Sequence, residues 1–343
     1  MILILFLMRQ GADHWAAAGV LQEFACSGGQ LQNSKGGVPR CPDRLPLING
    51  RCDYLSEPGL RPQSGLRRLG GQLLAAAHAG GRHNDGGVRH YVGMVSSANW
   101  LDRYRAGQRH QVWHELRQLG AAVREPGLSE QAQLVCDEMA RRARRNIEVI
   151  IERLSGAGYR FHSNDDAQEP VTPHFPPAAG AAAHADWLQQ RFGPVPMTLL
   201  SWVRLVGDVW LVGTHPQWAE SASADPLVIE AEGSRYPGEP ISGYFDNEHE
   251  VWREWAAQDP AEAGLFVLPL APDLVHKNNF SGGPPYGLIL PDGSADGLFA
   301  AETTMPFVSY LNWVFRHGGF PGRTAPDNRW QMKRVLARDL LPL

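Results

Sequence analysis

The chain has 343 residues, of which 43% are hydrophobic, and a formal net charge of -4 at pH 7. This composition predicts a globular protein with one large or two smaller domains. The longest strongly apolar stretch at the start, Met1 to Met8, is far shorter than the ~20 residues that cross a bilayer, and no signal-peptide cleavage pattern follows. The four cysteines match no zinc or disulfide pattern. We therefore expect a cytoplasmic protein with reduced thiols and no membrane span.

Charge is distributed unevenly along the chain. Residues 162–343 carry 11 Lys and Arg against 22 Asp and Glu, whereas residues 1–161 carry more basic than acidic residues. A surplus of carboxylates repels nucleic-acid phosphates and attracts basic surfaces. We therefore expect no nucleic-acid ligand and favour a basic protein as partner. The alternative is that the acidity only keeps the protein in solution.

Residues 1–93 differ from the rest of the chain. They contain 16 of the 37 glycines, and their apolar residues show no sustained period. Such a segment buries little surface and orders poorly. We interpret residues 1–93 as a poorly ordered extension that is not native, with the natural start at Met94. A genuine disordered arm is the alternative.

Two helices are predicted within residues 94–162. The first spans 108–119, and the second runs from a Ser129 cap to about Ser155. One face of the second helix is apolar and consists of Cys136, Met139, Ala143, Ile147, Ile150 and Leu154. The opposite face carries Arg141, Arg142, Arg144 and Arg145. Because glutamates are interleaved with these arginines, we interpret them as a solvated face rather than a phosphate or RNA site.

A proline-rich loop at 162–180 connects this helical hairpin to a second region, 181–343. There the apolar periods predict helices at 181–192, 196–206, 248–258 and 307–317, and strands at 209–213, 227–230, 265–270, 286–290 and 297–300. Hairpin-length loops between the late strands are typical of antiparallel pairing. The sequence therefore predicts an α+β protein, in which an N-terminal helical hairpin precedes a largely antiparallel sheet with flanking helices.

The turn-rich segment from Asp273 to Tyr286 is the best candidate for a site. Its polar side chains are His276, Lys277, Asn278, Asn279 and Ser281. An Asp-x-x-His pair near a serine suggests nucleophilic catalysis, in which an acid orients a base and the base activates a hydroxyl. Ser281, however, does not lie in a nucleophile elbow. The alternative is structural, with Asn and Ser side chains satisfying loop backbone groups and Lys277 pointing to water.

A second polar cluster contains His215 and Trp218 in one turn and Asp225 in the next. Two histidines and a carboxylate would suffice for a metal, for example His215, His276 and either Asp225 or Asp273. No spacing in the sequence demands one. We therefore expect a hydrogen-bonded histidine at 215, and neither a metal nor a cofactor. The sequence also contains no phosphate-binding or dinucleotide-binding glycine motif.

Tryptophans are concentrated in the second region. We expect most of them in the core, but Trp218 in its loop and the helical pair Trp252 and Trp255 to be half exposed. Exposed Trp and Tyr side chains are favoured anchors of a partner surface. These three side chains are therefore candidates for a binding face.

A set of short stretches forms a recognisable pattern within residues 100–322. They are Pro196…Trp202…Val206-Gly207, Gly213-Thr-His-Pro-x-Trp218, Asp225-Pro-Leu-Val228, Pro269-Leu-Ala-Pro-Asp-x-x-His-Lys-x-Asn279, Ser281-Gly-Gly-x-Pro-Tyr286 and Phe307-Val-x-Tyr-Leu311…Gly318-Gly-Phe-Pro-Gly322. The pattern resembles a family of uncharacterised bacterial proteins and, more remotely, the SUKH superfamily. That superfamily includes yeast cell-wall-assembly regulators and bacterial immunity proteins that bind and neutralise toxins. The resemblance implies an α+β binding scaffold without catalysis. This chain departs from the superfamily at Val206-Gly207-Asp208, where Asn-Gly is usual, and in its preceding helical hairpin.

The first functional hypothesis is a SUKH-like interaction module with a basic protein, such as a toxin, as partner. Its expected binding residues are His215, Trp218, Asp225, Asp273, His276, Lys277, Asn279, Ser281 and Tyr286. The alternative is a hydrolase or metal-dependent enzyme that uses His215, Asp225, Asp273, His276 and Lys277 in one cleft. Convergence of these five side chains would favour the enzyme.

Overall fold

The computed structural model describes residues 99–218, 221–235, 238, 240–322 and 328–343, which all belong to one compact unit. The extension expected at residues 1–93 lies outside the described residues. Helices flank antiparallel sheets, which confirms the predicted α+β fold class. Among the described helices, none is long and apolar enough to cross a bilayer.

The first helices of the described chain are α4 (Trp100–Arg105), α5 (Arg109–Leu119), the 3-10 helix η1 (Gly120–Arg124) and α6 (Ser129–Gly156). The sequence predicted α5 and α6 closely but missed the six-residue α4, which begins after an Asn99 cap. The expected Ser129 cap is wrong, because Ser129 is the first residue of α6 and no side chain caps that helix.

The apolar face of α6 is as predicted, whereas its arginine face is only partly exposed to solvent. Its apolar stripe is fully buried and consists of Cys136, Met139, Ala143, Ile147, Ile150 and Leu154. On the opposite face, Arg142 pairs with Glu138 and Arg144 pairs with Glu148, both at 3.0 Å across one helical turn. The Arg142 guanidinium also lies 5.3 Å from the centre of the Tyr104 ring. These arginines are thus engaged with the protein's own surface.

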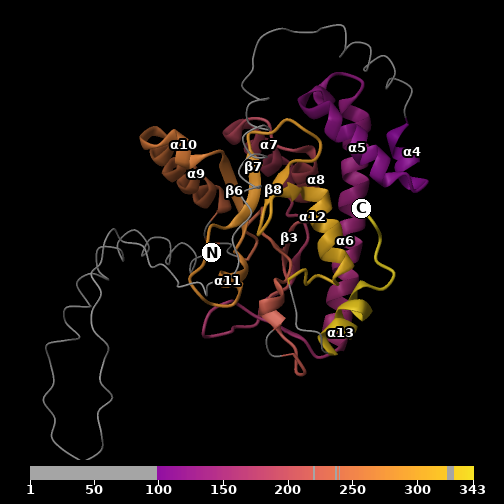
Figure 1. Ribbon diagram of the computed structural model, residues 1–343, viewed down its shortest axis with the longest axis vertical. Coiled ribbons are helices and arrows are strands. Elements are labelled where there is room, and N and C mark those ends of the chain that lie inside the picture. Colours follow the sequence, from indigo (N-terminus) through magenta and orange to yellow (C-terminus); the bar gives the residue numbers. More distant parts are fainter. Residues whose placement is uncertain (1–98, 219–220, 236–237, 239, 323–327) are drawn as a thin grey trace, which may run out of the picture. The chain divides into compact units, whose positions relative to one another are not determined.

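Later helices complete the packing around α6. They are α7 (Ala181–Phe192), α8 (Met197–Leu205), α12 (Phe307–Arg316) and α13 (Asn328–Ala337). Helix α8 packs along α6, α7 packs on α8, and α13 contacts both α6 and α12. Figure 1 shows α6 as the long helix, with α8 and α12 on its sheet side. The sequence did not predict α13, whose many charged residues leave only a weak apolar period.

The described strands form three antiparallel sheets. In the first, β1 (Arg160–Phe161) pairs with β4 (Gly213–Thr214). The second has the order β2-β3-β5, with β2 (His174–Phe175), β3 (Asp208–Trp210) and β5 (Val228–Ile229). The third has the order β6-β7-β8-β9, with β6 (Phe266–Ala271), β7 (Tyr286–Leu290), β8 (Leu298–Ala300) and β9 (Met305–Pro306). The Glu230 amide donates to the Leu270 carbonyl at 2.8 Å, so β5 adjoins β6.

Gly207 makes the tight turn between α8 and β3. Its φ is +86°, and a Cβ at this position would lie 2.2 Å from the Phe175 carbonyl oxygen. Both the left-handed backbone and the lack of space therefore require glycine. The Trp202 indole N–H donates to the Gly207 carbonyl at 2.9 Å and closes the turn. The helix predicted at 196–206 thus lies within one residue of its expected bounds.

Helix α9 (Ile241–Gln258) is longer than the predicted 248–258. Its first turns contain Gly243 and follow Pro240, and both residues are typical of a loop. The short helix α10 (Pro260–Ala263) follows, capped by Asp259. In Figure 1, α9 and α10 lie on the side of the strands away from α6.

Two asparagines hold the last residues of the described chain. Asn146 on α6 is 1% exposed, donates to the Leu341 carbonyl at 2.8 Å and accepts from the Leu341 amide at 2.7 Å. Asn312 on α12 binds Leu343 in the same way, at 3.3 Å and 3.0 Å. Each side-chain amide thus satisfies the backbone N–H and C=O of one residue in a segment without regular structure.

Candidate functional site

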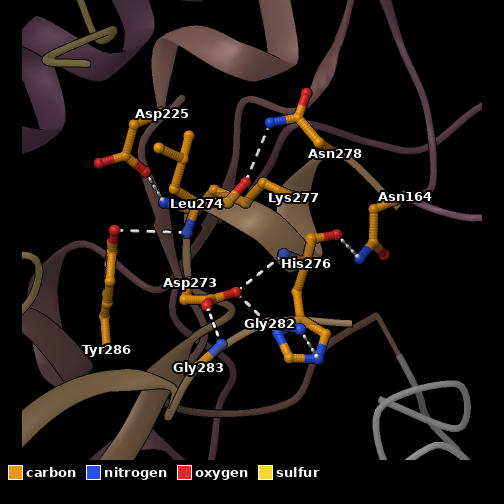
Figure 2. Close-up of polar contacts among 10 residues, drawn as sticks. All are labelled: Asn164, Asp225, Asp273, Leu274, His276, Lys277, Asn278, Gly282, Gly283 and Tyr286. Atoms are coloured by element: carbon orange, nitrogen blue, oxygen red, sulfur yellow. Dashed lines mark hydrogen bonds and ion pairs between the residues drawn. The ribbon is translucent and has the colours of Figure 1, made fainter. Parts of the chain in front are cut away.

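The candidate segment is built around one helical turn, α11 (Leu274–Lys277), which follows β6. Asp273 is its N-cap, and the Asp273 Oδ1 accepts from the His276 amide at 2.8 Å and from His276 Nδ1 at 2.7 Å. The other carboxylate oxygen accepts from the Gly283 amide (Figure 2). A Cβ at Gly282 would lie 2.4 Å from this carboxylate. The two glycines therefore let the loop wrap around Asp273.

Helix α11 ends in a Schellman-type arrangement. The Asn279 amide donates to the His276 carbonyl at 3.0 Å, and the Phe280 amide donates to the Val275 carbonyl at 3.1 Å. Asn279 takes the left-handed position with φ +63°. Asn tolerates this conformation better than most residues, because its short polar side chain can hydrogen-bond locally. The Asn at this position thus sets the direction in which the loop leaves α11.

The asparagine side chains around α11 have different partners. The Asn278 Nδ2 donates to the Leu274 carbonyl at 3.0 Å, as expected of a residue that satisfies loop backbone. The same expectation is wrong for Asn279, which is exposed and donates to the Asp166 carboxylate at 2.6 Å. From the 162–180 loop, Asn164 donates to the His276 carbonyl at 2.8 Å. That loop thus helps to hold α11 in place.

Lys277 lies inside the protein. Its Nζ is 2.5 Å from Asp225 Oδ1, and the two side chains are 0% and 3% exposed. The ammonium also lies 4.8 Å from the centre of the Tyr286 ring (Figure 2). The expectation that Lys277 points to water is therefore wrong, because its partner is 52 residues away in the sequence and a loop lysine gives no local sign of it. A buried pair of this kind requires both members, since a single buried charge is strongly unfavourable.

Two tyrosines surround the ion pair. The Tyr286 hydroxyl accepts from the Leu274 amide at 3.3 Å. Burial raises the pKa of Tyr286, and the negative charge of Asp225 raises it further. Burial also raises the pKa of Tyr310, with a contribution from Asp225, and its hydroxyl has no hydrogen-bond partner among the described residues. Both phenols are therefore protonated at neutral pH.

A second lysine, Lys333 on α13, is also buried in this part of the protein. Its Nζ donates to the Gly322 carbonyl at 2.8 Å and lies 6.0 Å from the centre of the Trp218 ring. Burial lowers the pKa of Lys333 to about 8, and the Asp225 charge opposes this shift. Trp218 is 2% exposed and packs on Phe320, so the expectation of a half-exposed Trp218 is wrong.

His215 is buried and accepts from the Gln217 amide through Nδ1 at 3.0 Å, which is the hydrogen-bonded role predicted for it. Within the described part of the chain, no hydrogen bond or ion pair joins His215 to His276 or to Asp225. The five residues suggested for one cleft thus form two separate pairs and a single histidine. The described residues also contain no group of three or more His, Cys, Asp or Glu side chains that could hold a metal ion.

The pair of Asp273 and His276 has the geometry of a carboxylate that orients an imidazole base. An activated nucleophile would complete a catalytic arrangement. In the described chain, Ser281 is exposed and its hydroxyl makes no hydrogen bond to His276. The other imidazole nitrogen of His276, Nε2, instead accepts a hydrogen bond from the Gly282 amide at 3.4 Å. The site therefore offers a half-buried imidazole without an assembled nucleophile.

An aromatic cluster that the sequence pattern did not predict lies beneath α9. His249 stacks on Trp252 at 5.6 Å between ring centres and meets the rings of Phe266 and Phe192 at 4.8 Å and 5.3 Å. Trp252 is half-buried and Trp255 is 48% exposed, as predicted for this pair. The i, i+3 spacing of His249 and Trp252 was the available signal for the cluster.

The chain matches no family model, and no match was found among curated proteins or solved structures. The proposed function therefore rests on the Asp273–His276 and Lys277–Asp225 pairs and on the surface around them.

Proposed function

We propose that the protein is a non-catalytic, cytoplasmic interaction module of the SUKH type that binds a protein partner. The observation that carries this proposal is the internal neutralisation of charge in the candidate segment. Lys277 and Asp225 neutralise each other in the interior, and Asp273 accepts hydrogen bonds from the turn that it caps and from Gly283 in the loop that follows. Side chains whose charges and hydrogen bonds are engaged within the protein stabilise a loop and are poorly placed to contact a substrate.

The outer surface of the same segment supports binding. Val275 and Phe280 are 40% and 69% exposed, and the polar Asn279 and Ser281 stand beside them. Apolar side chains that share a surface with polar ones are typical of protein contact sites. The buried candidate residues would then support this surface from within, and they are His215, Trp218, Asp225, Asp273, Lys277 and Tyr286. The acidic balance of residues 162–343 favours a basic partner, and the toxin-neutralising proteins that the sequence pattern resembles also bind proteins.

Two measurements test this proposal together. The purified protein is assayed against generic ester, phosphoester and amide substrates, and it is titrated with the protein products of genes that neighbour its own. We expect no turnover and a stable complex with one basic product. Turnover by the wild type that is lost in His276→Ala, without any such complex, would contradict the proposal.

A hydrolase is the second candidate, favoured by the 2.7 Å contact between Asp273 and His276. In that function His276 would act as the base and Asp273 would orient it. A substrate or water would have to reach Nε2 on its exposed side. Asp273→Asn would then lower kcat more than it weakens substrate binding, whereas an interaction module would have no turnover to lose.

A further inference from the structure

Six exposed residues of α9 form one continuous stripe, and Arg253 and Ala257 are exposed beside it. The six recur at spacings of three and four and are Asn247, Glu250, Val251, Glu254, Trp255 and Gln258. Residues with this spacing share one face of a helix. Val251 and Trp255 are 56% and 48% exposed and lie one turn apart, so they form an apolar pair within a polar stripe. We refer to these six residues as the α9 face.

The opposite side of α9 is firmly seated. Tyr244 and Phe245 are buried, and Trp252 packs on Phe266 at 5.6 Å between ring centres. His249 fills the space between these rings and Phe192. A helix held in this way does not have to be ordered when a partner binds, so its exposed side chains bind at a low entropic cost. Trp in particular offers a large and rigid contact area.

The charge around the α9 face is strongly negative. Between residues 246 and 262 the chain carries one cation, Arg253, and six carboxylates, which are Asp246, Glu248, Glu250, Glu254, Asp259 and Glu262. Arg191 on α7 pairs with Asp246 and Glu250, and Arg253 also pairs with Glu250. Within the described chain, Glu254, Asp259 and Glu262 make no ion pair. The negative potential is therefore strongest at the C-terminal end of α9, where Trp255 lies and where the helix dipole adds to it.

We propose that the α9 face is the docking surface for a basic amphipathic helix of a partner protein, an inference that rests on the proposed function. Charge complementarity selects the occupant, because Lys and Arg side chains would meet Glu254, which makes no ion pair among the described residues, while an apolar side chain covers Val251 and Trp255. A helix suits this stripe, since its own i, i+3 and i+4 rows run along those of α9. Exposed apolar groups rimmed by charge are typical of such contacts.

A second copy of this chain is the less favourable occupant. Its α13 carries Arg334 and exposes Val335 by 53%, and Arg338 follows directly after it, so this end of the chain also presents basic and apolar side chains. Pairing α9 of one copy with α13 of the next would be a heterologous contact, which leaves an unfilled face on every copy and continues as an open chain unless it closes into a ring. A foreign helix needs no such assembly.

The test uses the full-length protein and a synthetic peptide of about 20 residues with leucines along one side and lysines elsewhere, long enough to form a helix. The control peptide has glutamate in place of every lysine. Binding is measured by calorimetry, and the location of binding by hydrogen exchange. We expect the lysine peptide to bind and to slow exchange in residues 247–258, and the glutamate peptide not to bind.

Matched variants make the location specific. Trp255→Ala should weaken binding of the lysine peptide by about tenfold or more, as expected of a central aromatic anchor, and Glu254→Lys should weaken it several-fold. The controls are Leu134→Ala and Glu169→Lys, which change exposed residues outside α9 and should alter affinity by less than about twofold. Thermal melting of every variant establishes that it is folded.

Three outcomes would overturn the inference. They are absence of binding, equal affinity of wild type and Trp255→Ala, and self-association by sedimentation that Trp255→Ala abolishes. If the protein binds a partner protein and Phe280→Ala abolishes this binding while Trp255→Ala does not, the partner does not dock on the α9 face, but the proposed interaction function stands. Substrate turnover without any protein complex would remove the proposed function itself.

Discussion

Helix α11 and helix α9 use charged and apolar residues in opposite ways. In α11 the charged Lys277 is buried against Asp225, while the apolar Phe280 at its end faces water. In α9 the carboxylates face water around a half-exposed Trp255, and the underside is aromatic. Polar residue types alone therefore do not mark a functional surface. The location of each partner decides whether a charge supports the fold or is available to another molecule.

The largest effect is expected at the buried pair. Lys277→Ala should lower the free energy of unfolding by about 3–5 kcal/mol, because it leaves the Asp225 carboxylate buried without its partner. Urea denaturation of wild type and variant measures this loss. The outcome sharpens the comparison, since an exposed lysine would give a change close to zero.

A double variant is the control for this prediction. Lys277→Met combined with Asp225→Asn removes both charges, and Asn is suited to the left-handed backbone at residue 225, where φ is +55°. It should recover a substantial part of the stability lost in Lys277→Ala. If the double variant is less stable than the single one, the ion pair is not the source of the effect.

The next effect is expected at the α11 cap. Asp273→Ala should cost about 1–3 kcal/mol, because the His276 and Gly283 amides lose their acceptor. Differential scanning calorimetry measures the loss. Ser281→Ala is the matched control within the same loop and should be nearly neutral, because the Ser281 hydroxyl is exposed. An equal loss in both variants would show that the loop is sensitive to any change.

The Glu232 carboxylate is half-buried, so its exposure to water is intermediate between that of the buried Asp225 and that of the exposed carboxylates on α9. Glu232 accepts from the Ala178 amide at 3.1 Å, and burial raises the pKa of Glu232 to about 7, with the Asp208 charge adding to the shift. Folding therefore disfavours the ionised form, so wild type loses stability as pH rises from 4.5 towards 7. Glu232→Gln should be more stable than wild type by about 1 kcal/mol above pH 7, a modest figure because water screens this carboxylate. Below pH 4.5 the two proteins should melt alike.

Asn279 tests how much of α11 depends on backbone conformation. Asn279→Ala should cost about 1 kcal/mol, because alanine is strained at the left-handed position, whereas Asn279→Gly should be close to neutral. Chemical denaturation of the two variants makes the comparison. If glycine is as damaging as alanine, the bond to Asp166 matters more than the backbone.

The smallest effect on stability is expected at the α9 face. Trp255→Ala should change the free energy of unfolding by no more than about 0.5–1 kcal/mol, because half of this side chain already contacts water. Urea denaturation alongside Lys277→Ala gives the contrast directly. A loss as large as that of Lys277→Ala would mean that Trp255 is a structural residue and would break the comparison.

The apolar periodicity of the sequence predicted helices and strands, but the residues near each side chain in the sequence did not predict which distant side chain it contacts. The α6 stripe from Cys136 to Leu154 and the bounds of β7 follow from apolar spacing, which is a property of neighbouring residues. The four-residue α11 is too short to show a period, and Pro240 and Gly243 disguised the start of α9. The burial of Lys277 depends on Asp225. The burial of Trp218 depends on Phe320, and several helices and strands separate these two residues in the sequence. Contacts at such separations leave no trace in the local pattern.

The asparagine that holds the end of the chain has a consequence for the order of folding. Asn146 and Leu341 are 195 residues apart, so their contact closes one of the longest loops in the described protein. Contacts between distant residues form slowly, because the entropy of closing the loop is lost before the contact forms. During synthesis α6 leaves the ribosome well before residue 341, so the buried amide of Asn146 lacks this partner until residue 341 has been made. The packing of α6 is thus completed only by residues that are made long after the helix itself.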